Sequence, residues 1–236
     1  MQQLRVSSAL PDPPFEFYDN GAPSGFDVAL TQAIAREIGR AWTLVPFSGD
    51  SFEAIFDGLG ASADLVASGT TITPERQARA RFCAPYLRSG QSLVVNINAT
   101  PHATSLDALG GLAVGIQKGN TSEAVAQQLL AQGKIARIAW YAYHDIDKAL
   151  GDLEAGRIGA IIKLEPVMRA LTATRPSLRV VQAGLTVEMI AYCVALADKA
   201  LADDINAAQQ TLLANGTIEA LANRFNLLSP HTEIAR

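Results

Sequence analysis

The chain has 236 residues, of which 49% are hydrophobic and 18% charged, so it can bury a core and general disorder is excluded. Its formal net charge of −4 argues against a nucleic-acid-binding protein, which would be basic. No apolar run reaches the roughly 18 residues that a membrane-spanning helix needs. With two cysteines and three scattered histidines, the sequence favours neither a disulfide scaffold nor a metal site, and it predicts no cofactor.

The first half of the chain alternates short apolar strands with amphipathic helices. Strands are predicted over residues 4–9, 43–47 and 64–67. Helices are predicted over residues 27–40, where apolar side chains recur at helical spacing, and over residues 52–60. This alternation predicts a parallel sheet covered by helices.

A second alternation of the same kind begins near residue 90. Strands are expected over residues 92–95, 112–116, 138–141, 159–162, 180–181 and 190–196. Helices are expected over residues 122–132, 145–155, 164–171 and 201–226, the last interrupted at Gly216. Because no flexible linker joins the two alternations, the sequence predicts two α/β lobes facing each other across a ligand cleft.

The most informative motif reads SGTTITPER, at residues 68–76, directly after an apolar strand. Gly69 lacks a Cβ, so a ligand can approach the backbone there closely. Three hydroxyls that could donate to an anion surround it, those of Ser68, Thr70 and Thr71.

The same motif also opens a short helix. Thr73 suits the N-cap and Pro74 the first helical position, which puts Arg76 in the first turn. From there its guanidinium could return to the loop and bind a carboxylate in bidentate fashion. An ordinary capping loop with a solvated arginine would explain these residues equally well.

Further candidates are weaker when taken alone. The loop KGNTS at residues 118–122 opens a helix, whose N–H groups favour an anion, but such loops are common in α/β proteins. Phe15 and Phe52 could flank a small ligand, although aromatic side chains more often pack in a core. Cys83 and Cys193 are expected to be buried free thiols. No G-x-S-x-G elbow, P-loop or H-E-x-x-H motif is present, and no catalytic residue is predicted.

Together these residues resemble the family 3 extracellular solute-binding proteins, the polar amino-acid receptors of ABC transporters. The resemblance covers the whole chain and is carried, besides residues 68–76, by PFEF at 14–17, GFDV at 25–28, VGIQ at 114–117, LEAGR at 153–157 and NGT at 215–217.

The resemblance implies a fold and a division of the chain into two lobes. The fold would be the two-lobed α/β fold of type II periplasmic binding proteins, each lobe a mixed, mostly parallel sheet flanked by helices. Lobe 1 would comprise residues 1–88 and 188–236, lobe 2 residues 89–187, and the hinge would lie near residues 86–90 and 184–191.

Members of this family are exported. The chain is therefore expected to be a mature protein whose signal peptide has been removed, located in the periplasm or anchored outside a Gram-positive cell. It is expected to act as a monomer and to deliver its ligand to an ABC permease.

The resemblance also implies roles for the motif residues. Arg76 would bind the ligand carboxylate, helped by Thr71 and the backbone around Gly69. Phe52 would pack on the ligand from lobe 1. Lobe 2 would close over it with four consecutive residues, Lys118, Gly119, Asn120 and Thr121.

Two departures from the family pattern concern the ligand's amine. Receptors for α-amino acids carry an aspartate for the α-ammonium where this chain has Leu164, with Glu165 next to it. Asp12 stands where the family usually has an aromatic lid. Because a buried ammonium without a carboxylate is costly, either Asp12 or Glu165 has taken over the amine, or the ligand lacks an ordinary α-ammonium. The expected ligand is a small carboxylate-bearing solute, such as an amino acid, an amino-acid derivative or an opine.

Two other functions stay open at this point. The family includes a dehydratase offshoot that acts on prephenate or arogenate, and this chemistry needs a general acid, for which only Glu165 and Asp12 are candidates. The ligand-sensing domains of some receptors share the same fold. Activity on prephenate would distinguish the enzyme from the binding protein.

Overall fold

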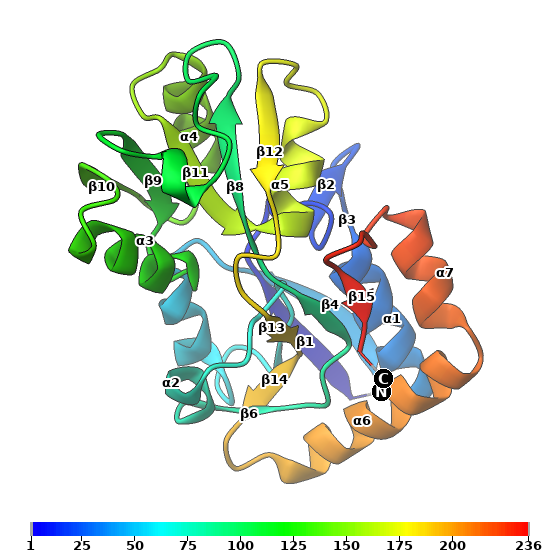
Figure 1. The fold of residues 1–236 in the computed structure, drawn as a ribbon. Helices are drawn as coiled ribbons and strands as arrows, with labels where there is room; N and C mark the ends of the chain where they lie inside the picture. The colour runs from blue at the N-terminus through cyan, green and yellow to red at the C-terminus, as the bar shows by residue number, and fades with distance from the viewer. Residues whose placement is uncertain (1, 236) are drawn as a thin grey trace. The chain divides into compact units, whose positions relative to one another are not determined.

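The computed structural model describes residues 2–235, which form two compact units. Unit 1 contains residues 2–48, 53–88 and 188–235, and unit 2 contains residues 49–52 and 89–187. The short segment 49–52 groups with unit 2, whereas the sequence placed it in lobe 1. Each unit is built on one five-stranded mixed sheet, so the expected α/β class is confirmed (Figure 1).

Unit 1 has a sheet with the strand order β4-β1-β5-β14-β6. Its strands are β1 (Gln3–Ser8), β4 (Ala41–Pro46), β5 (Leu65–Val66), β6 (Ala80–Phe82) and β14 (Cys193–Ala195). The first three are parallel, and β14 runs antiparallel to both of its neighbours. Because the parallel strands alternate with helical segments, their carboxyl ends carry loops at one edge of the sheet, where ligands commonly bind in α/β folds.

The remaining elements of unit 1 cover or extend this sheet. The helical segments are α1 (Phe26–Glu37), η1 (Phe52–Gly58), α2 (Pro74–Gln77), α6 (Lys199–Ala214) and α7 (Thr217–Arg224), and η1 begins in unit 2. A hairpin is formed by β2 (Phe17–Asp19) and β3 (Ala22–Ser24). A separate sheet has the order β13-β7-β15, from β7 (Leu87–Ser89), β13 (Glu188–Ile190) and β15 (Glu233–Ile234). The chain passes between the units within β7 and directly before β13, and also at both ends of the short segment 49–52.

Unit 2 has a sheet with the strand order β10-β9-β11-β8-β12. Its strands are β8 (Gln91–Asn96), β9 (Ala113–Gln117), β10 (Arg137–Tyr141), β11 (Ala160–Leu164) and β12 (Leu178–Gln182). Its helices are η2 (Leu106–Ala108), α3 (Ser122–Ala131), α4 (Ile146–Glu154) and α5 (Glu165–Thr172). Ile161 and Ile162 of β11 belong to different apolar clusters, because successive side chains of a strand point to opposite faces. Both faces of this sheet are therefore buried.

Most expected elements are present, and the differences have local causes. The expected strand 190–196 is divided into β13 and β14. The expected interruption of the helical segment 201–226 at Gly216 is confirmed, because Gly216 adopts a left-handed φ of 79° between α6 and α7. Neither the β2–β3 hairpin nor β6, β7 and β15 was predicted, because each is only two or three residues long. The two cysteines are buried free thiols as expected, and burial raises the pKa of Cys83 to about 12. Within residues 2–235, no helix has the length and apolar character needed to cross a membrane.

Candidate functional site

The loop that follows β5 in unit 1 is held in place by β13. The amide of Ile72 donates to the carbonyl of Met189 at 2.8 Å, and the amide of Ala191 donates to the carbonyl of Thr70 at 3.0 Å. The Thr71 hydroxyl donates to Oε2 of Glu188 at 2.5 Å. This pairing fixes the backbone of the loop and engages the proton of the Thr71 hydroxyl.

Two buried acids lie beneath the same loop. The hydroxyl of Ser68 donates to Oε1 of Glu16, and the amide of Gly69 donates to Oδ2 of Asp27 at 2.8 Å. Tyr192 donates its phenolic proton to the other oxygen of Asp27 at 3.2 Å. Burial raises the pKa of Asp27 to about 6, although the hydrogen bonds that it accepts act in the opposite direction. The Ser68 hydroxyl and the Gly69 amide thus bind the loop to these two acids. The Thr70 hydroxyl is also buried and has no hydrogen-bond partner among the described residues.

Arg76 lies where the sequence motif places it, in the first turn of α2. The Thr73 side chain caps this helix by accepting from the amide of Arg76 at 3.2 Å. The guanidinium turns back to the loop, where Nη1 donates to the Thr71 carbonyl at 3.0 Å and Nε donates to Oε1 of Glu53 at 2.8 Å. The side chain is only 4% exposed, which excludes the solvated arginine of the alternative interpretation.

Phe15 and Asp12 lie on the segment before β2. The Phe15 ring is fully buried, and a Cβ added at Gly69 would lie 3.0 Å from its Cδ2 atom. Phe15 therefore packs against Gly69, and its contact with a ligand stays a prediction. Asp12 is buried, and its amide donates to the Glu16 carbonyl at 2.7 Å, so the structure ties it to the acid beneath Ser68.

In unit 2 the carboxyl ends of β9, β10 and β11 meet the start of antiparallel β8 at one edge of the sheet. The predicted loop 118–121 lies at this edge, and the Lys118 amide donates to the Tyr141 carbonyl at 2.9 Å. The Gly119 amide donates to the Glu123 carboxylate, so helix α3 satisfies part of its own N-terminus. Thr121 accepts a 2.9 Å hydrogen bond from the Gln91 amide group of β8.

An aromatic pair with a lysine lies at the same edge. Phe52 is joined to the loop by its amide, which donates to the Lys118 carbonyl at 3.1 Å. The ring centroids of Phe52 and Tyr143 are 5.0 Å apart, and Nζ of Lys163 lies 5.2 Å from the Tyr143 centroid. Contrary to the expectation from the resemblance, Phe52 thus groups with unit 2 rather than with the first lobe. We place Phe52, Tyr143 and Lys163 in one group and call it the unit 2 aromatic edge.

The junction of β11 and α5 follows directly after Lys163. Leu164 is 8% exposed and occupies the N-cap position of α5, where its side chain makes no capping hydrogen bond. Glu165 is buried, its amide donates to the Gly90 carbonyl at 2.9 Å, and its carboxylate lies 3.6 Å from Arg169. The junction therefore combines an apolar residue, a buried acid and two basic side chains.

Several side chains of these two half-sites were not predicted, namely Glu16, Asp27, Tyr143, Lys163 and Glu188. Glu16 and Asp27 occur in the PFEF and GFDV motifs, which carry the family resemblance, whereas Glu188 lies in neither motif. Lys163 had a recognisable signal, because it interrupts the apolar run of β11, AIIKL. A charged residue inside a buried strand requires an explanation that a surface lysine does not.

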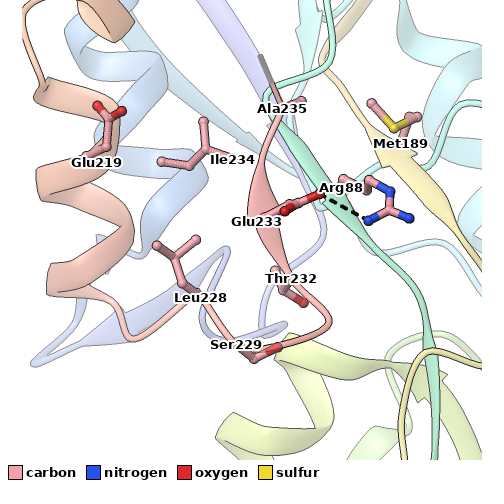
Figure 2. Close-up of a pocket in the computed structure, with 9 residues that line it drawn as sticks. All are labelled: Arg88, Met189, Glu219, Leu228, Ser229, Thr232, Glu233, Ile234 and Ala235. Atoms are coloured by element: carbon pink, nitrogen blue, oxygen red, sulfur yellow. Dashed lines mark hydrogen bonds and ion pairs between the residues drawn. The ribbon is translucent and has the colours of Figure 1, made fainter.

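Another hollow, of about 730 Å³, lies in unit 1 beside β15 (Figure 2). Its lining residues are Arg88, Met189, Glu219, Leu228, Ser229, Thr232, Glu233, Ile234 and Ala235. None of these residues was a predicted site residue, and the charged pair in it, Arg88 and Glu233, is exposed and joined at 3.0 Å. In residues 2–235, no group of three or more His, Cys, Asp or Glu side chains is arranged to hold a metal ion.

Known proteins are similar to this chain over most of its length. The profile of the bacterial extracellular solute-binding proteins, family 3, matches residues 4–227. The putative ABC transporter arginine-binding protein 2 of Escherichia coli (strain K12) is 28% identical over 231 residues, which are 95% of this chain and 90% of that protein.

A solved structure and an enzyme are also similar to the chain. The structure of an ancestral arginine-binding protein bound to arginine has a TM-score of 0.87 and 28% identity, with 95% of this chain and 98% of that chain covered. The cyclohexadienyl dehydratase of Pseudomonas aeruginosa PAO1 is 29% identical over 135 residues, 56% of this chain and 50% of the enzyme. Since the family profile matches nearly the whole chain, the protein belongs to the bacterial extracellular solute-binding proteins, family 3.

Proposed function

We propose that the protein is the substrate-binding component of an ABC importer and that it binds a small carboxylate-bearing solute. The observation that carries this proposal is the buried guanidinium of Arg76, which turns back to the loop at residues 68–71. A guanidinium has a planar set of donors that matches a carboxylate in bidentate geometry. The missing Cβ at Gly69 leaves room for the buried Phe15 ring, which packs against the loop that Arg76 contacts.

An ordinary α-amino acid would also need a carboxylate that binds its ammonium. Leu164 offers no charge, and Glu165, the nearest acid in sequence, has Arg169 at 3.6 Å. Asp12 remains the other candidate, from unit 1. We therefore favour a solute without an ordinary α-ammonium, such as an N-substituted amino acid or an opine-like compound, over a common α-amino acid.

Binding is proposed to work by closure. The half-site of unit 1 binds the carboxylate, and the half-site of unit 2, with Phe52 and the loop at 118–121, contacts the rest of the solute. A solute that contacts both half-sites only in the closed state shifts the equilibrium towards that state. The permease then recognises the closed protein, which is expected to be monomeric and periplasmic.

A dehydratase is the second candidate function, because a cyclohexadienyl dehydratase is among the relatives. That match covers 56% of the chain, whereas the arginine-binding protein of Escherichia coli covers 95%. Dehydration needs a positioned general acid. Glu165 and Asp12 are the acids to test.

The first experiment is thermal unfolding of protein freed of bound solute by denaturation and refolding. The panel contains the common L-amino acids, opines, betaines, simple carboxylates and prephenate. A solute at 100 times its Kd adds about 2.7 kcal/mol of stability, which raises Tm by several degrees. Stabilisation by carboxylates supports the proposal, and stabilisation by uncharged solutes alone contradicts it. Consumption of prephenate would instead establish the dehydratase.

A further inference from the structure

The guanidinium of Arg76 is held by an acid to which the proposed function gives no role. Nε of Arg76 donates to Oε1 of Glu53 at 2.8 Å, and Nη1 donates to the Thr71 carbonyl at 3.0 Å. Cζ of Arg76 lies 5.8 Å from the centroid of the Phe56 ring, which is a cation–π distance. All four residues belong to unit 1. Because the two hydrogen bonds start from different nitrogen atoms of one planar group, they fix the orientation of that plane as well as its position.

Glu53 belongs to a small network of charges between η1 and the segment around α2. Its second oxygen, Oε2, accepts from Nη1 of Arg79 at 3.1 Å, and Nη2 of Arg79 donates to Asp57 at 2.6 Å. The side chains of Arg79 and Asp57 are 36% and 71% exposed, whereas that of Arg76 is 4% exposed. Since exposed ion pairs contribute little, the contact of Glu53 with the buried Arg76 is the strong one of this network.

A carboxylate beside this guanidinium has two opposite effects on the binding of an anionic solute. Its negative charge repels the solute, which lowers the affinity. Its hydrogen bond orients the long Arg76 side chain before the solute arrives, so that less rotamer freedom is lost on binding, which raises the affinity. The Glu53 side chain is 37% exposed, so water and salt screen its charge, whereas screening does not change the geometry of its hydrogen bond. We therefore expect the orienting effect to be the larger.

We propose that Glu53 is a positioning residue for the solute's carboxylate, which acts through Arg76 by fixing the orientation of the guanidinium. This inference rests on the proposed function, in which Arg76 binds the carboxylate. It predicts the sign of the effect against simple electrostatics. Displacing the Glu53 acceptor weakens the binding of an anion, whereas removing only the negative charge does not.

The test separates the position of the acceptor from its charge. Glu53→Gln keeps an oxygen at the same place along the side chain and removes the charge, whereas Glu53→Asp keeps the charge and shortens the side chain by one methylene group. The control is Asp57→Asn, which removes a charge of the same network from a residue that contacts Arg79. Urea unfolding checks that each protein is folded, and Glu53→Ala replaces Glu53→Asp, with the same expectation, if the latter is not.

Two measurements are made on protein freed of bound solute. Isothermal titration gives the Kd of each protein for L-arginine, L-glutamine, octopine, succinate and any other carboxylate that stabilises the wild type in the thermal panel. The NMR signal of the Arg76 Nε–H group, assigned by its absence in Arg76→Gln, reports the hydrogen bond to Glu53 without any solute. A general loss of stability would not selectively change this signal.

For each probe that binds the wild type, we expect Glu53→Asp to raise the Kd at least tenfold, and Glu53→Gln and Asp57→Asn to change it less than threefold. The Nε–H proton should exchange slowly with water in the wild type and in Glu53→Gln, and faster in Glu53→Asp. If Glu53→Asp binds as tightly as the wild type, or if Glu53→Gln or Asp57→Asn loses as much affinity as Glu53→Asp, the inference is wrong and the proposed function stands. If no probe binds the wild type, both are wrong.

Discussion

The amide of Gly69 donates a 2.8 Å hydrogen bond to Oδ2 of Asp27, a carboxyl group that has no solvent exposure. The loop proposed to bind the solute is therefore built on a buried acid from the first helix of the chain. Because burial raises the pKa of Asp27 to about 6, this support changes its protonation within an accessible pH range.

Asp27→Asn should alter the pH dependence of stability. Between its ordinary value of 3.8 and about 6, the folded protein holds a proton on Asp27 that the unfolded chain releases. The wild type therefore gains stability as the pH falls through this window, and asparagine, which cannot take up the proton, lacks the gain. The difference in unfolding free energy between wild type and variant should grow on the order of 3 kcal/mol from pH 7 to 4, at about 1.4 kcal/mol per pKa unit.

Urea unfolding at four pH values from 7 to 4 measures this difference. The exposed Asp204→Asn serves as the control for loss of one negative charge. A difference between wild type and Asp27→Asn that stays constant over the whole range would show that the buried carboxyl is ionised throughout.

Gly69→Ala should destabilise the protein more than Gly21→Ala does. Both glycines have a left-handed φ, 51° and 81°, but only the Cβ of Ala at 69 would meet the buried Phe15 ring, at 3.0 Å. Strain of the backbone alone costs about 1–2 kcal/mol. Overpacking against the ring adds roughly 1–3 kcal/mol at Gly69.

Chemical denaturation of both variants measures the two costs. The double variant Gly69→Ala with Phe15→Leu should lose less unfolding free energy than the sum of the two single variants. The reason is that the smaller side chain leaves space for the added methyl group. Equal costs at the two glycines, or strict additivity in the double variant, would mean that the ring does not restrict the loop.

The sequence predicted those features that depend on local pattern. Helical periodicity located α1 and α6, and cap chemistry located α2, with Thr73 as its N-cap. The motif at 68–76 left two interpretations of Arg76 open, and the structure shows the one in which the guanidinium returns to its own loop. These results need only neighbours in the chain, which is why one sequence was sufficient.

Contacts between distant segments could not be predicted in this way. Glu188 meets Thr71 across 117 positions, because β13 happens to run beside the loop. The family resemblance assigned Phe52 to the first lobe, yet its amide donates to the Lys118 carbonyl. Periodicity gives the face of a strand or helix but not the partner that covers it, so the supporting acids and Lys163 were missed.

Arg76→Gln should abolish tight binding of any carboxylate that stabilises the wild type. Truncating one partner of a buried, hydrogen-bonded charge pair costs about 2–5 kcal/mol, which corresponds to a loss in affinity of thirtyfold or more. The control is Arg79→Gln, because Arg79 also contacts Glu53, at 3.1 Å, but is 36% exposed. It should change the Kd less than threefold.

Titration calorimetry of both variants with the best carboxylate from the thermal panel measures these effects. Similar losses for the two arginines would attribute the effect to Glu53, their common partner, and would remove Arg76 from the site. Retained affinity in Arg76→Gln would contradict the proposed carboxylate site directly.

Leu164→Asp should add a carboxylate for a solute's amine at a position where the wild type has an apolar side chain. Leu164 is the N-cap of α5 and is 8% exposed, so an aspartate there could cap the helix and place a carboxylate at the edge of unit 2. The added carboxylate would attract an α-ammonium. We expect the affinity for L-amino acids to rise at least tenfold.

Leu164→Asn is the matched control, since asparagine caps helices about as well as aspartate but carries no charge. Calorimetric titration of wild type and both variants with L-arginine, L-glutamine and glutarate separates capping from charge. If Leu164→Asn reproduces the gain, the helix cap and not the carboxylate is responsible. If neither variant changes the ranking of the three solutes, residue 164 does not face the ligand, and the argument from the missing aspartate fails with it.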